Sequence, residues 1–242
     1  MAVASVAFIS DIHGNRPALE AVVADIRRRG VQDIYCLGDL VGYGPDPNGV
    51  IDLIREMGIP AIAGNYDDGV GWERGDCGCY YASAEARSIG DASYAFTVKA
   101  VTADRKRFLR DLPGELHVAL GEVKLHLVHG SPRQINEYLL SDRDERTFIR
   151  LAAAETDDVL VFGHTHQPWY RVYGDVLFVN VGSVGRPKDG DARAMYTVLR
   201  TVPGRPVELV ALRVAYDVEA VARAVEAAQL PPGLAEALRR GV

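Results

Sequence analysis

The stretch that decides the fold runs from residue 3 to residue 15 and reads VASVAFISDIHGN. Its first seven residues, 3–9, are apolar or small and form a run of the right length for one buried strand. A carboxylate and an imidazole, Asp11 and His13, follow this run almost at once. Polar side chains at the carboxyl end of a buried strand are typical of an α/β sheet with a functional site at its edge.

The next fifty residues alternate between helix and strand. Apolar positions at helical spacing predict helices over 17–29 and 47–57, and apolar runs predict strands over 33–37 and 60–63. A strand–helix–strand–helix–strand order at this pace indicates parallel βαβ units. Residues 67–93 show neither period, and we expect them to be irregular.

The second half of the chain contains more strands than helices. Helices are expected over 102–112, with Thr102 as N-cap, over 142–154, with Ser141 as N-cap, and over 218–228. Strands are expected over 116–120, 123–129, 159–162, 170–173, 176–181, 194–200 and 207–214. We therefore expect one domain, 1–242, of two packed sheets flanked by helices, in which 67–113 is a helical and loop insertion beside the site.

Composition places the chain among ordinary globular proteins. Hydrophobic residues make up 48% and charged residues 25% of 242, which excludes a disordered or collagen-like chain. A net charge of −6 disfavours nucleic acid as a partner. No apolar run approaches the roughly 20 residues of a membrane span, and the first ten residues lack the basic flank of a signal peptide. Three cysteines cannot form a disulfide framework, so we expect a cytoplasmic protein without membrane contact.

Side chains that bind metals recur where the predicted strands end. Because the carboxyl ends of strands gather at one sheet edge, these side chains are expected to converge. Mixed oxygen and nitrogen ligands suit divalent transition ions, and seven ligands suit two ions that share a carboxylate. Two ions about 3.5–4 Å apart form a clamp for in-line displacement at phosphorus. The candidates are Asp11, His13, Asp39, Asn65, His129, His164 and His166.

Five short blocks in this order resemble the calcineurin-like metallophosphoesterases, from about residue 5 to residue 200. They are Asp11-Ile12-His13, Gly38-Asp39, Gly64-Asn65-Tyr66-Asp67, His129-Gly130 and Gly163-His164-Thr165-His166. Each block alone is common in unrelated proteins, but the ordered set is specific. Residues 11–15 and 180–187 resemble the small bacterial branch of the family, which includes phosphodiesterases and proteins assigned as diadenosine-tetraphosphate hydrolases.

The resemblance implies a four-layer αββα sandwich with two mixed β-sheets and a dimetal site at the carboxyl edge of the strands. By the family pattern, Asp11, His13 and His166 hold one divalent ion, Asn65, His129 and His164 hold the other, and Asp39 bridges them. The ions are of the Mn, Fe, Zn, Ni or Co type, with Mn favoured, and a hydroxide held by both would attack phosphorus directly. The pattern also implies catalytic roles for Asp39, Tyr66 and Asp67, and substrate contacts for Asn15 and Tyr66. Arg133, shortly after the His129 block, is interpreted either as a phosphate contact, since arginine suits phosphate geometry, or as an exposed loop residue.

The third block departs from the family at Tyr66, where most members have a histidine. A phenol titrates near pH 10, so Tyr66 can donate a hydrogen bond but is a poor proton shuttle at neutral pH. We interpret this as a preference for leaving groups that need little protonation. The alternative is that Tyr66 is a packing choice of this branch.

The function expected from the resemblance is dimetal-dependent hydrolysis of a small phosphodiester or phosphoanhydride, such as a dinucleoside polyphosphate. One alternative is a phosphomonoesterase, including a protein phosphatase, and another is a non-catalytic scaffold for protein contacts; a homo-oligomer is left open. His117 and His126 match no block and are interpreted as locally paired strand residues. Cys77 and Cys79 are interpreted as structural or incidental, and Trp72, Tyr80 and Tyr81 as either packing residues or a surface that stacks on a base.

Overall fold

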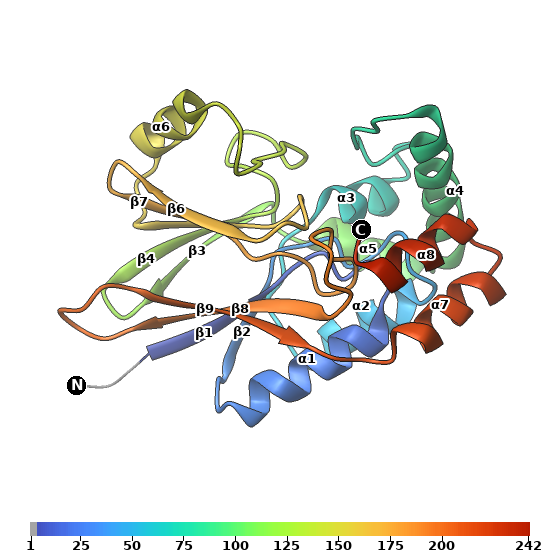
Figure 1. Ribbon diagram of the computed structural model, residues 1–242, viewed down its shortest axis with the longest axis horizontal. Helices are drawn as coiled ribbons and strands as arrows, with labels where there is room; N and C mark the ends of the chain where they lie inside the picture. Colours follow the sequence, from blue (N-terminus) through green and yellow to red (C-terminus); the bar gives the residue numbers. More distant parts are fainter. Residues whose placement is uncertain (1–3) are drawn as a thin grey trace.

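A computed structural model describes residues 4–242 and contains two β-sheets that lie face to face (Figure 1). The first sheet has the strand order β2 (Asp33–Cys36), β1 (Ala4–Ile9), β8 (Ala194–Thr201), β9 (Glu208–Val214). β1 and β2 are parallel, whereas β8 is antiparallel to both β1 and β9. This sheet is therefore mixed, and the first and last thirds of the chain build it together.

The second sheet is also mixed. Its order is β3 (Glu115–Leu120), β4 (Val123–Val128), β5 (Val159–Phe162), β7 (Val176–Asn180), β6 (Trp169–Tyr173). The central strands β4, β5 and β7 are parallel, and the edge strands β3 and β6 run antiparallel to their neighbours. The carboxyl ends of the central strands thus lie at one edge.

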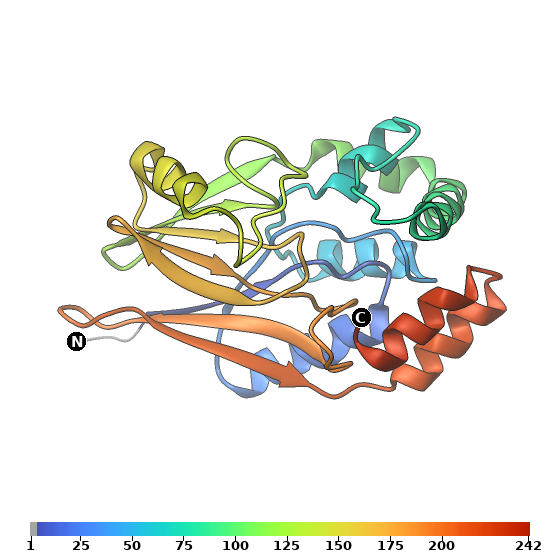
Figure 2. The ribbon, with the colours of Figure 1, turned by 45° about the horizontal axis from the view of Figure 1, so that its top comes forward.

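Helices cover the outer faces of both sheets (Figure 2). α1 (Arg16–Arg28) packs on the first sheet and α6 (Glu145–Ala154) on the second, which completes the expected αββα sandwich. The other helices gather at one end of the sandwich, on the right in Figure 1. They are α2 (Pro47–Glu56), α3 (Asn65–Trp72), α4 (Ala84–Ala100), α5 (Ala103–Asp111), α7 (Val218–Ala227) and α8 (Pro232–Arg240).

The buried strands show why the chain forms layers. Successive strand residues point to opposite faces, so a strand covered on both sides must be apolar throughout. In β1, Val6 and Phe8 belong to the core between the two sheets. Ala7 and Ile9 belong to the core that the first sheet forms with the helices. The unbroken apolar run at the start of the sequence is therefore the signature of a middle layer.

The expectation that residues 67–93 are irregular is wrong, because α3 and the first half of α4 lie there. Local capping explains both helices better than apolar periodicity does. Asp67 accepts a hydrogen bond from the amide of Gly64 at the start of α3, at 2.9 Å, and Ser83 accepts one from Ala86 at the start of α4. Glycines in α3 and small residues in α4 hide the helical period.

Other boundaries also differ from the expectation. Residues 60–63 contribute only an isolated bridge between Ala61 and Cys36 rather than a strand. The N-cap of α6 is Asp144, whose carboxylate accepts from Arg146, and not Ser141. α8 was not expected, because it is short and begins at a pair of prolines, Pro231 and Pro232. In each case a local polar contact or chain reversal outweighed the apolar pattern.

Residue 3, the first residue of the expected strand, lies outside the described residues. Within residues 4–242 no helix combines the length and the hydropathy that crossing a membrane requires.

Candidate metal centre and active site

The expected metal ligands lie together, buried, at the carboxyl edge of both sheets. Six of them form two groups in which the ligand atoms are within 4.8 Å of one another. The first group is Asp11, His13 and His166, and the second is Asp39, His129 and His164. Asn65 joins the second group, because its Oδ1 lies 3.1 Å from Nε2 of His129.

Each group draws its residues from both sheets. Asp11 and His13 follow β1 and Asp39 follows β2 in the first sheet, whereas His129 follows β4 and His164 follows β5 in the second. The site therefore lies between the sheets, where neither sheet alone could complete it.

The backbone fixes the orientation of three imidazole rings. Nδ1 of His13 donates to the carbonyl of Val41 at 2.9 Å, and Nδ1 of His129 donates to that of Leu37 at 2.7 Å. Nδ1 of His166 donates in the same way to the carbonyl of Arg186 at 2.5 Å. With Nδ1 protonated, Nε2 keeps its lone pair, and Nε2 of His13 lies 3.1 Å from Nε2 of His166. Ring nitrogens that face each other in this way are arranged as metal ligands.

Asp39 lies between the two groups. One carboxylate oxygen, Oδ2, is 3.6 Å from Nε2 of His13 and 3.4 Å from Nε2 of His129. The other oxygen, Oδ1, accepts a hydrogen bond from the amide of Tyr66 at 2.8 Å. Asp39 is therefore in contact with a histidine of each group.

The electrostatics of the cluster suit metal binding. Burial lowers the pKa of both His13 and His164 to about 3, so both rings are neutral at pH 7. Burial alone would raise the pKa of Asp39, but the neighbouring His129 holds it well below its usual range. The Asp39 carboxylate in turn outweighs the effect of burial on His129 and raises its pKa to about 9, so an ion at Nε2 of His129 would displace a proton. Within residues 4–242, Oδ1 of Asp11 and Nε2 of His164 are buried without any hydrogen-bond partner. Such orphaned atoms are explained when they are ligands, so the residues fit two divalent ions.

Glycine at the strand ends permits close packing of the ligand loops. Gly38 has φ +91°, and a Cβ there would collide with the backbone of Gly64. A Cβ on Gly64 would in turn collide with the amide and carboxylate of Asp39. The backbones of Gly38-Asp39 and Gly64-Asn65 therefore lie directly against each other. Neither glycine position has room for a side chain.

Tyr66 is buried beside the first group, with its ring edge-on to His13 at 5.5 Å between centroids. Its hydroxyl has no hydrogen-bond partner in the described part of the chain. Burial raises the pKa of Tyr66 well above its ordinary value, so the phenol is neutral. Tyr66 can therefore donate a hydrogen bond, but it is an even weaker acid than a phenol in water.

Asp67 has a positioning role in this structure. Its carboxylate accepts hydrogen bonds from the amides of Leu40, at 3.0 Å, and Gly64, at 2.9 Å. Burial, followed by the charge of Asp39, raises the pKa of Asp67 to about 8. Asp67 thus ties the loop after β2 to the start of α3 and holds the Asp39 and Asn65 blocks together.

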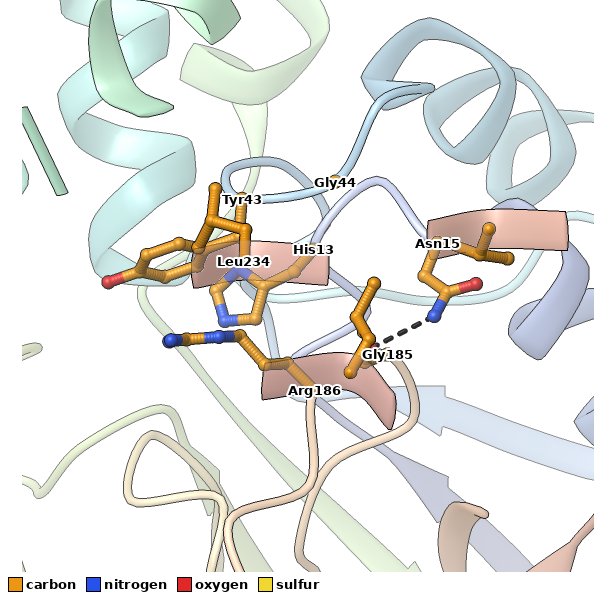
Figure 3. Close-up of a pocket in the computed structure, with 9 residues that line it drawn as sticks. His13, Asn15, Tyr43, Gly44, Gly185, Arg186 and Leu234 are labelled. Carbon is orange, nitrogen blue, oxygen red and sulfur yellow. Dashed lines mark hydrogen bonds between the residues drawn. The ribbon is translucent and has the colours of Figure 1, made fainter. Parts of the chain in front are cut away.

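Two expected substrate contacts are engaged elsewhere. The amide of Asn15 accepts from Ala18 as the N-cap of α1 and donates to the carbonyl of Gly185 at 2.9 Å (Figure 3). The guanidinium of Arg133 pairs with Glu137 at the surface. The structure does not bring either side chain into the cluster, and their contact with substrate stays a prediction.

Arg186 and Lys188 are candidate phosphate contacts that the sequence analysis did not identify. The Arg186 guanidinium lies over the ring of Tyr43, 4.0 Å from its centroid. Both side chains line a pocket that His13 also lines (Figure 3). Burial and the charge of Arg186 lower the pKa of Lys188 to about 7. Both residues follow β7, whose carboxyl end lies at the same edge as those of β4 and β5; Arg186 falls in the 180–187 run that resembles the family, and Lys188 comes directly after it.

The aromatic and cysteine residues of the insertion lie around the site rather than in it. Trp72 and Tyr80 are exposed and pack in no core among residues 4–242, and the guanidinium groups of Arg74 and Arg110 lie over the Trp72 ring. Stacking of these rings on a base stays a prediction. Cys77 and Cys79 form a disulfide, a link that was not expected from three cysteines. The Asn65 amide donates to the carbonyl of Cys77 at 2.9 Å, so this turn helps to orient a metal ligand.

Comparisons with known proteins agree with this geometry. Residues 5–202 match the model of the calcineurin-like phosphoesterase superfamily domain. The chain is 32% identical to the Methanocaldococcus jannaschii protein MJ0912 over 98% of both chains. It is 28% identical to the phosphodiesterase YfcE of Escherichia coli K12 over 76% of this chain and 81% of the relative. The crystal structure of a metallophosphoesterase from Sphaerobacter thermophilus superposes with a TM-score of 0.78, at 30% identity and 99% coverage of both chains. The chain therefore belongs to the calcineurin-like phosphoesterase superfamily, the metal-dependent hydrolases of phosphoric esters.

Proposed function

We propose that the protein hydrolyses small phosphodiesters or phosphoanhydrides, such as dinucleoside polyphosphates, with two divalent ions in its buried centre. The observation that carries this proposal is the complete ligand set, with the Asp39 carboxylate within 3.6 Å of an imidazole from each group. Two bound ions would lower the pKa of water toward neutrality and offset the charge of the phosphoryl group. A scaffold protein would have no need to keep every ligand.

The chain also supplies its own groups for the phosphoryl oxygens. The Nε atom of Arg186 is buried and has no hydrogen-bond partner among the described residues. Lys188 is half-buried, and the carboxylates whose charge acts on it are Asp11 and Asp39. A planar guanidinium matches the geometry of phosphate oxygens, and a lysine adds a point charge. Together they support recognition of an anionic phosphoryl group by this pocket.

The choice of a diester or anhydride rests on Tyr66 and on the relatives. A neutral phenol with a raised pKa assists poorly in protonating a leaving group, so a substrate whose leaving group is stable as an anion is favoured. A nucleotide released from a phosphoanhydride is such a group. The Escherichia coli relative is described as a phosphodiesterase, which agrees with this class.

Hydrolysis assays with Mn²⁺ test the proposal. We expect a higher kcat/KM for bis(p-nitrophenyl) phosphate and diadenosine tetraphosphate than for p-nitrophenyl phosphate. Asp39→Ala should reduce turnover to background while circular dichroism shows a folded protein, because Oδ2 of Asp39 lies within 3.6 Å of an imidazole from each ligand group. Asp33→Ala, an exposed carboxylate at the start of β2, is the matched control and should keep full activity.

Three outcomes would contradict the proposal. Full activity of Asp39→Ala would remove the metal centre from the reaction. A preference for the monoester would favour the phosphomonoesterase alternative. No hydrolysis together with fewer than one bound ion per chain would favour a scaffold.

A further inference from the structure

A second group of metal-binding side chains lies on the outer face of the second sheet. His117 on β3 is directly opposite His126 on β4 in the antiparallel register. The two rings stack with centroids 4.2 Å apart and planes 21° from parallel. Glu115 precedes His117 by two residues and so shares its face of β3. Glu155 and Asp157, in the connection between α6 and β5, complete the group.

This group is separate from the dimetal centre. His126 precedes His129 by three residues, an odd number, so the sequence predicts that the two histidines face opposite sides of the sheet. The structure confirms this prediction, because His126 contacts Glu115 and Glu155 whereas His129 contacts Asp39 and Asn65. None of the outer residues belongs to the proposed catalytic machinery.

Carboxylates hold one nitrogen of each outer ring. Nδ1 of His117 is hydrogen-bonded to the Asp157 carboxylate, and Nδ1 of His126 lies 2.8 Å from Oε2 of Glu155. The Glu155 side chain is 5% exposed, and its Oε1 also accepts from the amide of Thr156 at 2.9 Å. When an ion takes Nε2 of either ring, Nδ1 of that ring carries the proton and donates it to the carboxylate. A carboxylate that orients a histidine in this way is the usual support of a histidine metal ligand.

We propose that Nε2 of His117, Nε2 of His126 and the carboxylate of Glu115 bind a divalent transition ion of the zinc type. The candidate ligand atoms of these three residues lie within 4.8 Å of one another, and Glu115 Oε2 is 3.2 Å from Nε2 of His126. Glu115 is half exposed, so its side chain is free to close on an ion with ligand distances of about 2.0–2.2 Å. Water completes the fourth position.

Charge and ligand type both favour this occupant. With neutral imidazoles the three carboxylates carry a charge of −3, which a divalent ion reduces to −1. Imidazole nitrogen suits zinc better than magnesium or calcium, which prefer all-oxygen sites. The ion would cross-link β3 to β4, and the Nδ1 contacts to Asp157 and Glu155 join this hairpin to the α6–β5 connection.

Metal content after equilibrium dialysis against ZnCl₂ tests this site. We expect the wild-type chain to bind one zinc ion more than the double variant Glu115→Gln/His117→Gln. The two altered side chains are about half exposed, so the variant is expected to fold, which circular dichroism checks. Glu122→Gln, an exposed carboxylate at the turn of the same hairpin, is the matched control and should bind as many ions as the wild type.

A crystal of the zinc-loaded protein gives a second readout. An anomalous peak beside Nε2 of His117, Nε2 of His126 and the Glu115 carboxylate supports the site. Equal zinc content in the wild type and the double variant overturns the proposal. The contacts of His117 and His126 with carboxylates would then be ion pairs that hold no metal. An equal loss in Glu122→Gln also overturns the proposal, because the binding would then be unspecific. The comparison counts one ion at the outer face, so it is independent of whether the inner centre is catalytic.

Discussion

Five of the seven candidate ligands of the inner centre have left-handed backbone conformations. Asp11, His13, Asp39, His164 and His166 have φ between +50° and +64°. For residues other than glycine this region costs about 1–2 kcal/mol each, and it persists where the surrounding structure over-determines it. Strain at five ligand positions is typical of a functional site, and it turns each side chain back toward the centre directly after its strand.

Tyr66 decides the leaving-group preference at the residue scale. We expect a rate series on aryl phosphodiesters of graded leaving-group pKa to show a steep dependence for the wild type, since its neutral phenol protonates little. Tyr66→His should give a shallower slope, because an imidazole near neutral pKa can act as a general acid. The gain on the poorest leaving group should approach the ~10²–10⁴-fold of general acid catalysis.

Tyr66→Phe is the control for this series, because it keeps the ring and removes only the unpartnered hydroxyl. Its slope should match that of the wild type. Equal slopes for wild type and Tyr66→His would show that Tyr66 is only a packing residue.

At the scale of elements, a buried carboxylate joins α1 to β8. Asp25 of α1 accepts hydrogen bonds from the Tyr196 hydroxyl and from Nε of Arg29, both at 2.6 Å, and pairs with Arg28. Burial alone would raise the pKa of Asp25, but these hydrogen bonds outweigh it and lower the pKa. The ionised carboxylate is therefore the form that holds the helix to the sheet.

The lowered pKa of Asp25 predicts a pH dependence of stability. A carboxyl whose folded pKa is depressed stabilises the fold above its unfolded pKa, about 3.9, and loses this contribution as the pH falls through the folded value. Asp25→Asn should lower the free energy of unfolding at pH 7 by about 1–2 kcal/mol. The difference from the wild type should shrink below about pH 4, as measured by urea unfolding.

Asp33→Asn is the matched control for Asp25→Asn, since Asp33 is exposed at the start of β2. It should change the free energy of unfolding little at either pH. A constant difference between wild type and Asp25→Asn down to pH 2 would rule out this linkage.

At the scale of the whole molecule, the inner centre joins two sheets that otherwise meet through apolar contacts. Each ligand group takes residues from both sheets. Without ions, buried carboxylates and imidazoles would face one another between the layers. Ions bound there therefore stabilise the packing of the sandwich as well as serving the reaction.

Removal of the ions should lower the melting temperature. One ion at a free concentration a hundredfold above its Kd adds about 2.7 kcal/mol to the free energy of unfolding. For a chain of this size, that corresponds to roughly 5–10 °C. We expect a shift of this order between Mn²⁺-loaded and chelator-treated wild type in differential scanning calorimetry, and a much smaller one for Asp39→Ala. The same shift in both proteins would place the stabilising ion outside this centre.

The local sequence was enough to predict most strands and to identify the seven candidate ligands that the fold brings together in the inner centre. The apolar runs of β1, β4 and β5 have the right length for buried strands, and Asp11, His129 and His164 follow them. It was not enough for α3 and α8, where capping and chain reversal decide the structure. It also missed Arg186, which lies in the 180–187 run, because only the fold places its guanidinium over Tyr43 and beside His13.

The sequence by itself determined the order of strands and helices and the chemical identity of the inner ligands, since both depend on side chains close together in the chain. Only the tertiary structure decided which ligands meet. His13 and His166 are 153 residues apart, and their 3.1 Å approach requires both sheets to be packed. The same packing turned Asn15 into a cap, engaged Arg133 with Glu137, and brought His117 and His126 together on the outer face. Contacts between distant segments arise from burial and register, which no single stretch of sequence contains.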